Sequence, residues 1–243
     1  MLYGMHPVIE CLKAGRRRVL EILAVRQEHS GRIDAVLTRA VSAGIPVRRI
    51  SRDEFARLAP GKVHQGICAR VDSYPFVDLS EMLAAAGPQP LLLLLDQIVD
   101  VQNFGSLVRT ALCAGAKGVI ITRKRSAQPS PAVSKASAGA LEHMPLVRAT
   151  NMAGTIKQLK AAGFWIAGLA GPASRSIFNV DLTGPFALVV GGEQKGIRPL
   201  VRRHCDLLVG IPQQGPLDSL NASTAGAVAL FEAVRQRRVA QAR

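Results

Sequence analysis

Aromatic residues are scarce in this sequence, since Phe, Trp and Tyr together make up 4% of its 243 residues. A base-stacking platform for single-stranded nucleic acid needs such rings, so their scarcity argues against one. Acidic residues are also few, with 17 Asp and Glu against 31 Lys and Arg, for a formal net charge of +14. Because a cation near a phosphate releases a condensed counterion, this imbalance favours a polyanionic partner bound through its backbone and shape. The alternative is a basic but otherwise ordinary enzyme.

Metal-binding and secretory signals are missing as well. The four cysteines, Cys11, Cys68, Cys113 and Cys205, lie far apart, without a CxxC pair or a Cys/His cluster. We therefore expect reduced structural thiols and no metal site. No apolar run approaches the length of a membrane span, and residues 1–15 lack the apolar core of a signal peptide. These absences predict a cytoplasmic protein.

What the sequence does contain is enough apolar material for one large or two small domains, with 48% hydrophobic and 20% charged residues. Residues 1–74 alternate strand and helix patterns and predict a small α/β unit. Its strands are expected at 19–25, 47–50 and 66–71, and its helices at 6–14, at 32–43 and after Ser51, which forms a capping box with Glu54. Residues 75–90 contain Pro75, Pro88 and Pro90 and predict an extended linker.

Residues 91–243 predict a second domain with nearly continuous apolar strands. Strands are expected at 91–95, 119–122, 146–148, 165–170 and 187–190, and helices at 103–113, 131–140 and 151–162. Apolar strands with helices between them indicate a parallel sheet covered on both faces. Ligands bind such sheets at the carboxyl ends of their strands, which places residues 96–102 and 191–196 at the expected site.

Three segments of this domain carry chemistry. After the leucine run 91–95, a helix is expected from Asn103, which would cap it, with Arg109 leaving on the face away from the core. Residues 188–198 read LVVGGEQKGIR, an apolar strand ending in glycines that let the main chain approach a ligand. Residues 211–226 read IPQQGPLDSLNASTAG, in which Ser219 or Asn221 is a natural N-cap for the last helix.

Taken in order, these segments resemble the three motifs of the SpoU, or TrmH, branch of the SPOUT methyltransferases. The motifs are Asn103-Phe104-Gly105-x-x-x-Arg109, Gly191-Gly192-Glu193-x-x-Gly196, and Ile211-Pro212 to Ser219-Leu220-Asn221. Residues 3–8, 63–67 and 137–140 are similar to the bacterial subgroup that methylates guanosine 2′-hydroxyls of 23S rRNA, so the resemblance covers almost the whole chain.

The resemblance implies an α/β-knot domain, whose C-terminal segment threads a loop to form a trefoil knot, preceded by an RNA-binding domain like ribosomal protein L30. It also implies S-adenosylmethionine as cofactor, RNA as substrate and a homodimer packed through the knot region. An alanine-rich last helix, with Ala222, Ala225, Ala229 and Ala233, would suit a close contact between two copies, although such helices also pack inside monomers.

Residue roles follow from the same resemblance. Main-chain contacts to the cofactor would come from Gly191 or Gly192, Ile211 and Leu220, and the side chains of Ile211 and Leu220 would also enclose its apolar ring. Gly196 and Gln213 would complete the cofactor-binding residues. The catalytic residues would be Arg109, Asn103 and Glu193, and in the family the equivalent arginine activates the ribose hydroxyl, sometimes as a base. Because an arginine is a reluctant base, we favour a role in which Arg109 holds the adjacent phosphate and stabilises the oxyanion that forms. Ser219 and Asn221 would orient the acceptor nucleotide, and Arg16, Arg17 and Arg18 would contact phosphates.

Other interpretations of these residues stay open. Without the combined motifs, the glycines would be a turn, Ile211 and Leu220 would be core, and Glu193 would have a structural role. Val101 stands where the family usually has proline, and Gln213 where methionine is frequent, which makes the expected cofactor pocket more polar.

The function also has alternatives. Neither GxGxxG nor a P-loop is present, which argues against dinucleotide and nucleoside-triphosphate enzymes. One remaining alternative is a tRNA or another rRNA 2′-O-methyltransferase of the same family. The other is a non-catalytic RNA-binding or ribosome-assembly protein. The sequence leaves the modified nucleotide open.

Overall fold

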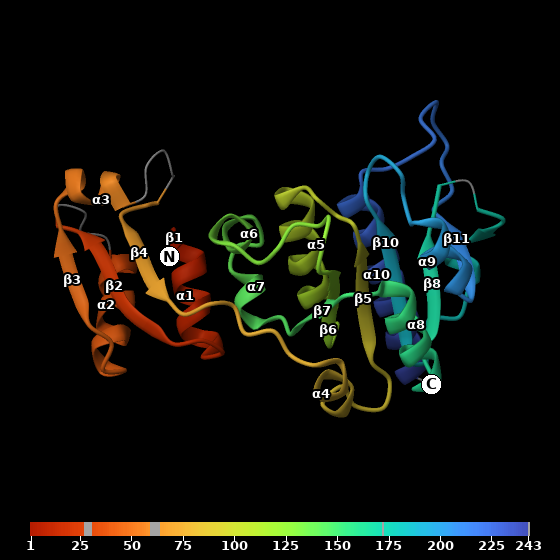
Figure 1. Ribbon diagram of the computed structural model, residues 1–243, viewed down its shortest axis with the longest axis horizontal. Helices are drawn as coiled ribbons and strands as arrows, with labels where there is room; N and C mark the ends of the chain where they lie inside the picture. The colour runs from red at the N-terminus through yellow and green to blue at the C-terminus, as the bar shows by residue number, and fades with distance from the viewer. Residues whose placement is uncertain (27–30, 59–63, 172, 243) are drawn as a thin grey trace. The chain divides into compact units, whose positions relative to one another are not determined.

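The computed structural model describes residues 1–26, 31–58, 64–171 and 173–242, so Val63 of the segment 63–67 lies outside the described residues. The chain divides into two compact units (Figure 1). The N-terminal unit comprises Met1–Pro75 together with Pro129–His143, and the C-terminal unit comprises Phe76–Gln128 and Met144–Arg243.

The N-terminal unit is built on a four-stranded sheet in the order β1-β4-β2-β3. β4 (Ile67–Val71) runs antiparallel to both β1 (Leu2–Tyr3) and β2 (Val19–Val25), and β3 (Val47–Ile50) runs parallel to β2. The helices are α1 (Met5–Ala14), α2 (Gly31–Ser42) and α3 (Arg52–Leu58), which begins after the predicted cap Ser51. The predicted α/β pattern of this stretch is confirmed.

Two short helices from further along the chain complete the N-terminal unit. α6 (Pro131–Ala136) and α7 (Ala140–His143) pack against α1. The sequence predicts one helix over 131–140, and this prediction is wrong because Ala138 and Gly139 have φ of 51° and 86°. At Gly139 a Cβ would lie 2.7 Å from the Glu10 side chain and 2.9 Å from the His6 carbonyl oxygen, so only glycine fits here.

A buried ion pair holds this segment in the N-terminal unit. The Glu142 side chain is 1% exposed and accepts hydrogen bonds from Nε and Nη2 of Arg17, both at 2.7 Å. The Ser134 hydroxyl donates to the same carboxylate at 2.7 Å, and His143 Nε2 lies 2.8 Å from Glu10 Oε2. Charged hydrogen bonds therefore connect α1 and the turn that follows it to α6 and α7.

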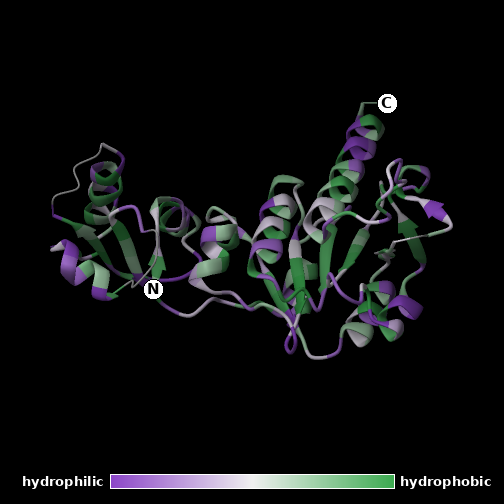
Figure 2. Ribbon diagram, turned by 90° about the horizontal axis from the view of Figure 1, so that it is seen from above, coloured by the Kyte–Doolittle hydropathy of each residue, from purple (hydrophilic) through white to green (hydrophobic). Residues whose placement is uncertain are grey.

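The C-terminal unit contains a seven-stranded sheet in the order β7-β6-β5-β10-β8-β11-β9. Its strands are β5 (Leu91–Asp96), β6 (Gly118–Thr122), β7 (Leu146–Ala149), β8 (Trp165–Leu169), β9 (Arg175–Ser176), β10 (Phe186–Gly191) and β11 (Leu207–Gly210). Every described pairing in this sheet is parallel, which confirms the predicted sheet type. Figure 2 shows its central strands as hydrophobic.

Helices cover both faces of this sheet. α4 (Leu79–Ala84), α8 (Met152–Ala161) and α9 (Pro199–His204) contribute Met82, Ile156 and Val201 to one core cluster. On the other face, α5 (Val101–Cys113) packs against α10 (Ala222–Gln241), which also contacts β10. The leucines of β5 are at most 2% exposed, as expected for a strand buried on both faces. A short 3-10 helix, η1 (Ile177–Asn179), follows β9.

Three local predictions need correction. Residues 75–90 are not wholly extended, because Leu79 and Met82 pack on the sheet as the helix α4. Asn103 does not cap α5: the helix begins two residues earlier, and the Asp100 carboxylate accepts from the Asn103 backbone N–H at 2.7 Å. β9, β11 and α9 were not predicted, since each is short and carries little periodicity.

The last helix, α10, has a side-chain cap at its start and small residues where it packs against the rest of the unit. Of the two predicted candidates, Ser219 and Asn221, it is Asn221 that caps the helix, by accepting from the backbone N–H groups of Ser223 and Thr224. Ala229 and Ala233 are at most 1% exposed, and a Cβ at Gly226 would overlap the Leu107 side chain of α5. Ala229 and Ala233 therefore pack within the chain, as the alternative allowed, whereas Ala222 and Ala225 are only partly buried.

The cysteine side chains differ in access, which predicts their reactivity. Cys11 and Cys68 are buried, and burial raises the pKa of each thiol to about 11, as it does for Cys205. Cys113 is exposed. A thiolate is the reactive form, so titration with Ellman's reagent at pH 8 should show one fast thiol in the folded protein and four after denaturation. Cys113→Ser should remove the fast phase, and its survival would contradict this assignment.

Among the described residues, no helix is long and apolar enough to cross a lipid bilayer.

Candidate active site

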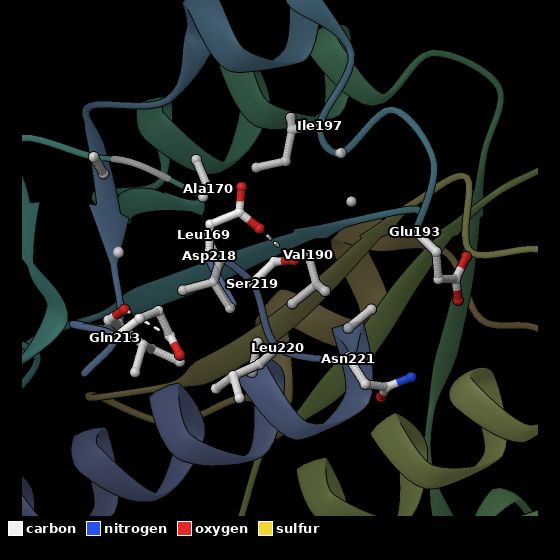
Figure 3. Close-up of a pocket in the computed structure, with 18 of the residues that line it drawn as sticks. Leu169, Ala170, Val190, Glu193, Ile197, Gln213, Asp218, Ser219, Leu220 and Asn221 are labelled. Carbon is white, nitrogen blue, oxygen red and sulfur yellow. Dashed lines mark hydrogen bonds between the residues drawn. The ribbon is translucent and has the colours of Figure 1, made fainter. Parts of the chain in front are cut away.

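A cavity of about 680 Å³ lies in the C-terminal unit, where the parallel strands end. Its walls come from the segments after β8, β10 and β11 and from the first residues of α10. Segments more than 40 residues apart in sequence thus meet at one place (Figure 3). A volume of this size is typical of sites for small molecules.

The turn after β10 brings backbone to the cavity wall. A Cβ on Gly191 would overlap the backbone of Gly196 and Ile197, and one on Gly192 would lie 2.5 Å from the Gln97 carbonyl oxygen. Gly196 has φ of 60° and donates its N–H to the Gly192 carbonyl at 2.8 Å. All three glycines line the cavity, as the sequence predicts, and the tightness of the turn explains why side chains are excluded there.

The remaining predicted cofactor residues lie on the segment after β11. Ile211, Gln213 and Leu220 all line the cavity. Gln213 Nε2 donates to the Ile211 carbonyl at 2.8 Å, so the polar group at this position is occupied within its own loop. Leu220 is 39% exposed, which leaves apolar surface available to a ligand.

The predicted substrate residues Ser219 and Asn221 also line the cavity. The Ser219 hydroxyl lies 3.2 Å from Asp218 Oδ1, and the Asn221 side chain is engaged as the helix cap. Figure 3 shows Ser219, Leu220 and Asn221 at the amino end of α10, on the same side of the cavity. The structure therefore brings both predicted residues to the cavity.

Glu193 connects this cavity to α5. Its carboxylate accepts a hydrogen bond from Asn103 Nδ2, and in Figure 3 it points away from the other labelled side chains. Glu193 lines the cavity, whereas Asn103 and Arg109 do not. Arg109 is exposed, two turns along α5 from the amino end of the helix. The structure thus joins Asn103 to Glu193 and leaves Arg109 outside the cavity of its own chain.

A buried carboxylate that the sequence analysis missed anchors the site. Asp96, at the end of β5, is 0% exposed and accepts from Nη2, Nε and the backbone N–H of Arg198 at 2.6, 2.9 and 2.9 Å. The pair connects the end of β5 to the end of the glycine turn. The one sequence signal was a carboxylate directly after five leucines, a position at which a charge is buried only if it is paired.

The predicted phosphate contacts Arg16, Arg17 and Arg18 lie in the N-terminal unit and differ from one another. Arg17 is occupied by Glu142 and is 10% exposed, so a contact between Arg17 and a phosphate is not proposed. Arg16 Nη1 donates to the Tyr74 hydroxyl at 3.0 Å. Burial raises the pKa of Tyr74 to about 12, so this hydroxyl stays protonated. Arg18 is exposed.

The donors present suit a nucleoside cofactor better than a metal. Tight glycine backbone and the aliphatic side chains of Ile211 and Leu220 offer main-chain hydrogen bonds and apolar walls. Among the described residues, no group of three or more His, Cys, Asp or Glu side chains could hold a metal ion.

Comparisons with known proteins cover both units. Residues 90–231 match the model of the SpoU rRNA methylase family, and residues 1–77 match an RNA 2′-O ribose methyltransferase substrate-binding domain. The 23S rRNA (guanosine-2′-O-)-methyltransferase RlmB of Haemophilus influenzae is 41% identical over 240 residues, which is 97% of each chain. RlmB of Pseudomonas putida is 41% identical over 241 residues, covering 98% of this chain and 97% of that protein.

Among solved structures, the SpoU methyltransferase AviRb of Streptomyces viridochromogenes in complex with AdoMet superimposes with a TM-score of 0.85. The alignment covers 98% of this chain and 89% of AviRb, at 26% identity. Both units therefore have counterparts in one known structure.

Proposed function

This chain belongs to the SpoU rRNA methylase family, and we propose that it methylates the ribose 2′-hydroxyl of a guanosine in 23S rRNA, with S-adenosylmethionine as methyl donor. The match to the family model confirms the family predicted from the three motifs, and the similarity to AviRb confirms the predicted α/β-knot fold class. The observation that carries the proposed activity is the cavity itself, because the second and third motifs meet there from distant parts of the chain.

The residues present fit the proposed cofactor. Gly191, Gly192 and Gly196 would offer main-chain groups, and Ile211 and Leu220 would enclose an apolar ring. These groups are fixed by the fold before any ligand arrives, which lowers the entropy lost on binding. S-adenosylmethionine, when bound, supplies an electrophilic methyl group. Gln213 adds polarity at the wall, and its internal hydrogen bond limits the effect on affinity.

Residues of α5 would bind and activate the nucleotide that accepts the methyl group. A ribose 2′-hydroxyl is a poor nucleophile and loses its proton as it attacks. We propose that Arg109 holds the neighbouring phosphate with its planar guanidinium and stabilises the developing oxyanion, while the proton leaves to phosphate or water. Asn103 and Glu193 would act as positioning residues, since their hydrogen bond connects the first turn of α5 to the glycine turn.

Arg109→Lys tests this role. The variant should bind S-adenosylmethionine like the wild type but lose turnover by about 100-fold, because lysine keeps the charge and loses the fork that fits a phosphate. Titration calorimetry measures the first quantity, and transfer of a tritiated methyl group to 23S rRNA transcript measures the second. Arg203→Lys, an exposed position on α9, is the matched control. Near-normal turnover in Arg109→Lys would remove the proposed role.

Calorimetry also separates the enzyme from a non-catalytic RNA-binding protein, which would take up no S-adenosylmethionine even with RNA supplied.

The substrate is a separate question. Residues 1–77 match a substrate-binding domain. The two RlmB proteins, which align with at least 97% of this chain, are named as methyltransferases of 23S rRNA. Mapping 2′-O-methyl groups in total RNA from cells with and without this chain would identify the nucleotide, and a lost tRNA position would favour the alternative substrate. We propose that the protein works in the cytoplasm.

We further propose a homodimer packed through the C-terminal unit. Phe231 on α10 is 48% exposed and Val99, just before α5, is 61% exposed, so the α5 and α10 region presents apolar surface. A second copy would also bring another Arg109 near the cavity, which the chain's own Arg109 does not line.

Phe231→Glu should convert this dimer to a monomer in light scattering after gel filtration, because a carboxylate would be buried without a partner. Val239→Glu, at a 45% exposed position two turns further along α10, is the control and should stay dimeric. A Phe231→Glu protein that is still a dimer would place the contact elsewhere.

A further inference from the structure

We propose that the turn after β6 is a second RNA-binding surface, which holds phosphates of the strand that leads to the active site. This basic turn consists of residues 123–128 and contains Arg123, Lys124 and Arg125 in succession. The proposal deepens the proposed function by adding an RNA contact on the C-terminal unit itself.

The three cations of the basic turn are available to a ligand. Arg123, Lys124 and Arg125 are all exposed. Within the part of the chain that the structure describes, no ion pair joins any of them to a carboxylate. Arg17 and Arg198, by contrast, are held by Glu142 and Asp96. Three neighbouring like charges repel one another, so their arrangement favours an anion that neutralises them.

Hydrogen bonds fix the shape of the turn. The Ser126 hydroxyl and Gln128 Nε2 both donate to the Thr122 carbonyl, at 2.6 and 3.1 Å. The Arg123 N–H donates to the Ala149 carbonyl at 2.8 Å, which continues the pairing with β7. Arg125 has φ of 56°, the left-handed conformation that closes the turn. The backbone that carries the cations is therefore ordered before RNA binds, so less entropy is lost on binding.

The position of the turn connects it to the proposed catalytic helix. β6 pairs with β5, which pairs with β10, so the segments after these three strands lie side by side at one edge of the sheet. The Ala127 N–H donates to the Ile98 carbonyl at 2.8 Å, and the Gly192 N–H donates to the Asp96 carbonyl at 3.1 Å. The segment between β5 and α5 is thus held on one side by the basic turn and on the other by the glycine turn.

The chemistry of the turn indicates phosphate rather than bases. Arginine and lysine bind phosphate oxygens, which position an RNA strand without reading its sequence. The turn contains no aromatic residue on which a base could stack. A strand whose ribose is at α5 would therefore be held by its flanking phosphates.

The test is a triple variant, R123Q/K124Q/R125N, in which asparagine is used at position 125 because it tolerates the left-handed conformation. Binding of the variant to unmodified 23S rRNA transcript should weaken by about 10-fold or more at low salt. The slope of log K against log salt should fall by about 2, since each lost contact to a single strand contributes about 0.7. The affinity for S-adenosylmethionine and the turnover at saturating RNA should be unchanged, because neither site is altered.

The control, K117Q/K157Q/R203Q, removes the same net charge from the C-terminal unit. Lys117 precedes β6, and Lys157 and Arg203 lie in the second halves of α8 and α9, which lead into β8 and β11. All three positions are exposed and belong to the opposite edge of the sheet. The control variant should show a smaller change in the slope than the turn variant.

The outcomes separate this proposal from the proposed function. If the wild type methylates the transcript and the turn variant matches the control in both slope and Michaelis constant for RNA, the basic turn does not bind RNA. If the wild type binds the transcript without methylating it, the proposed function fails, and the difference in slope still decides whether the turn binds RNA.

Discussion

Arg198→Met is expected to lower the free energy of unfolding by about 3–5 kcal/mol, because it leaves the Asp96 carboxylate buried without its cation. Asp96 is 0% exposed, whereas the Arg198 side chain is 40% exposed and can be hydrated when it is alone. The reciprocal change Asp96→Asn should therefore cost less. This asymmetry distinguishes a buried carboxylate that needs a partner from a surface ion pair, which contributes about 0–1 kcal/mol.

Denaturant unfolding followed by circular dichroism measures these free energies, and Arg203→Met on α9 is the control that removes an exposed arginine. The double variant Asp96→Asn/Arg198→Met should recover part of the loss, since the buried charge is gone. Binding of S-adenosylmethionine should also weaken in Arg198→Met, because Arg198 ends the segment that carries Gly191 and Gly192. If Arg198→Met unfolds like the control, Asp96 does not depend on this pairing.

Glu142→Ala should destabilise the N-terminal unit by a similar amount, about 3–5 kcal/mol, because Arg17 would be left buried and unpaired. Both side chains are at most 10% exposed, so water cannot replace the carboxylate without a rearrangement. The Ser134 hydroxyl would lose its acceptor as well. Hydrogen exchange is the informative measurement, since amide protection should fall in residues 129–143 and around Arg17 and stay unchanged at β10.

Glu10→Ala is the matched control for this experiment. Glu10 pairs with the neighbouring His143 and with Lys13, but its side chain is 24% exposed and solvent can replace part of the interaction. We expect a loss of about 1 kcal/mol or less. Equal effects of Glu142→Ala and Glu10→Ala would show that burial does not strengthen the Arg17 pair.

Much of the cofactor site could be predicted because it consists of glycines and chain-end signals. The residue type of Gly191, Gly192 and Gly196 predicts a turn that comes close to a ligand, and the family resemblance adds their role at a cofactor. The position before an alanine-rich run leaves Ser219 and Asn221 as candidate caps, of which the structure uses Asn221. Such features act on the local backbone and leave a trace in the local sequence. The Asp96–Arg198 pair leaves only a carboxylate directly after five leucines, which does not identify its partner, since the two residues are 102 positions apart and only the tertiary fold joins them.

The helix starts show the same limit on a smaller scale. Asp100 and Asn103 are both good caps, and local propensity could not choose between them. Hydrogen bonds distinguish the two, because beginning α5 at Val101 lets the Asp100 carboxylate accept from the Asn103 N–H and leaves Asn103 Nδ2 for Glu193, 90 positions further along the chain. The break between α6 and α7 could not be predicted from the local sequence either, because it depends on the contact of Gly139 with α1.

The placement of Pro129–His143 in the N-terminal unit has a consequence for synthesis of the chain. The first 75 residues leave the ribosome without the carboxylate that neutralises Arg17 and without the two helices that cover α1. This unit can therefore finish folding only after residue 143 has emerged, by which time β5 and β6 of the other unit are already outside the exit tunnel. A protein cut after residue 77 should consequently be less stable than its apparent domain boundary suggests, and maturation of the two units is coupled in time.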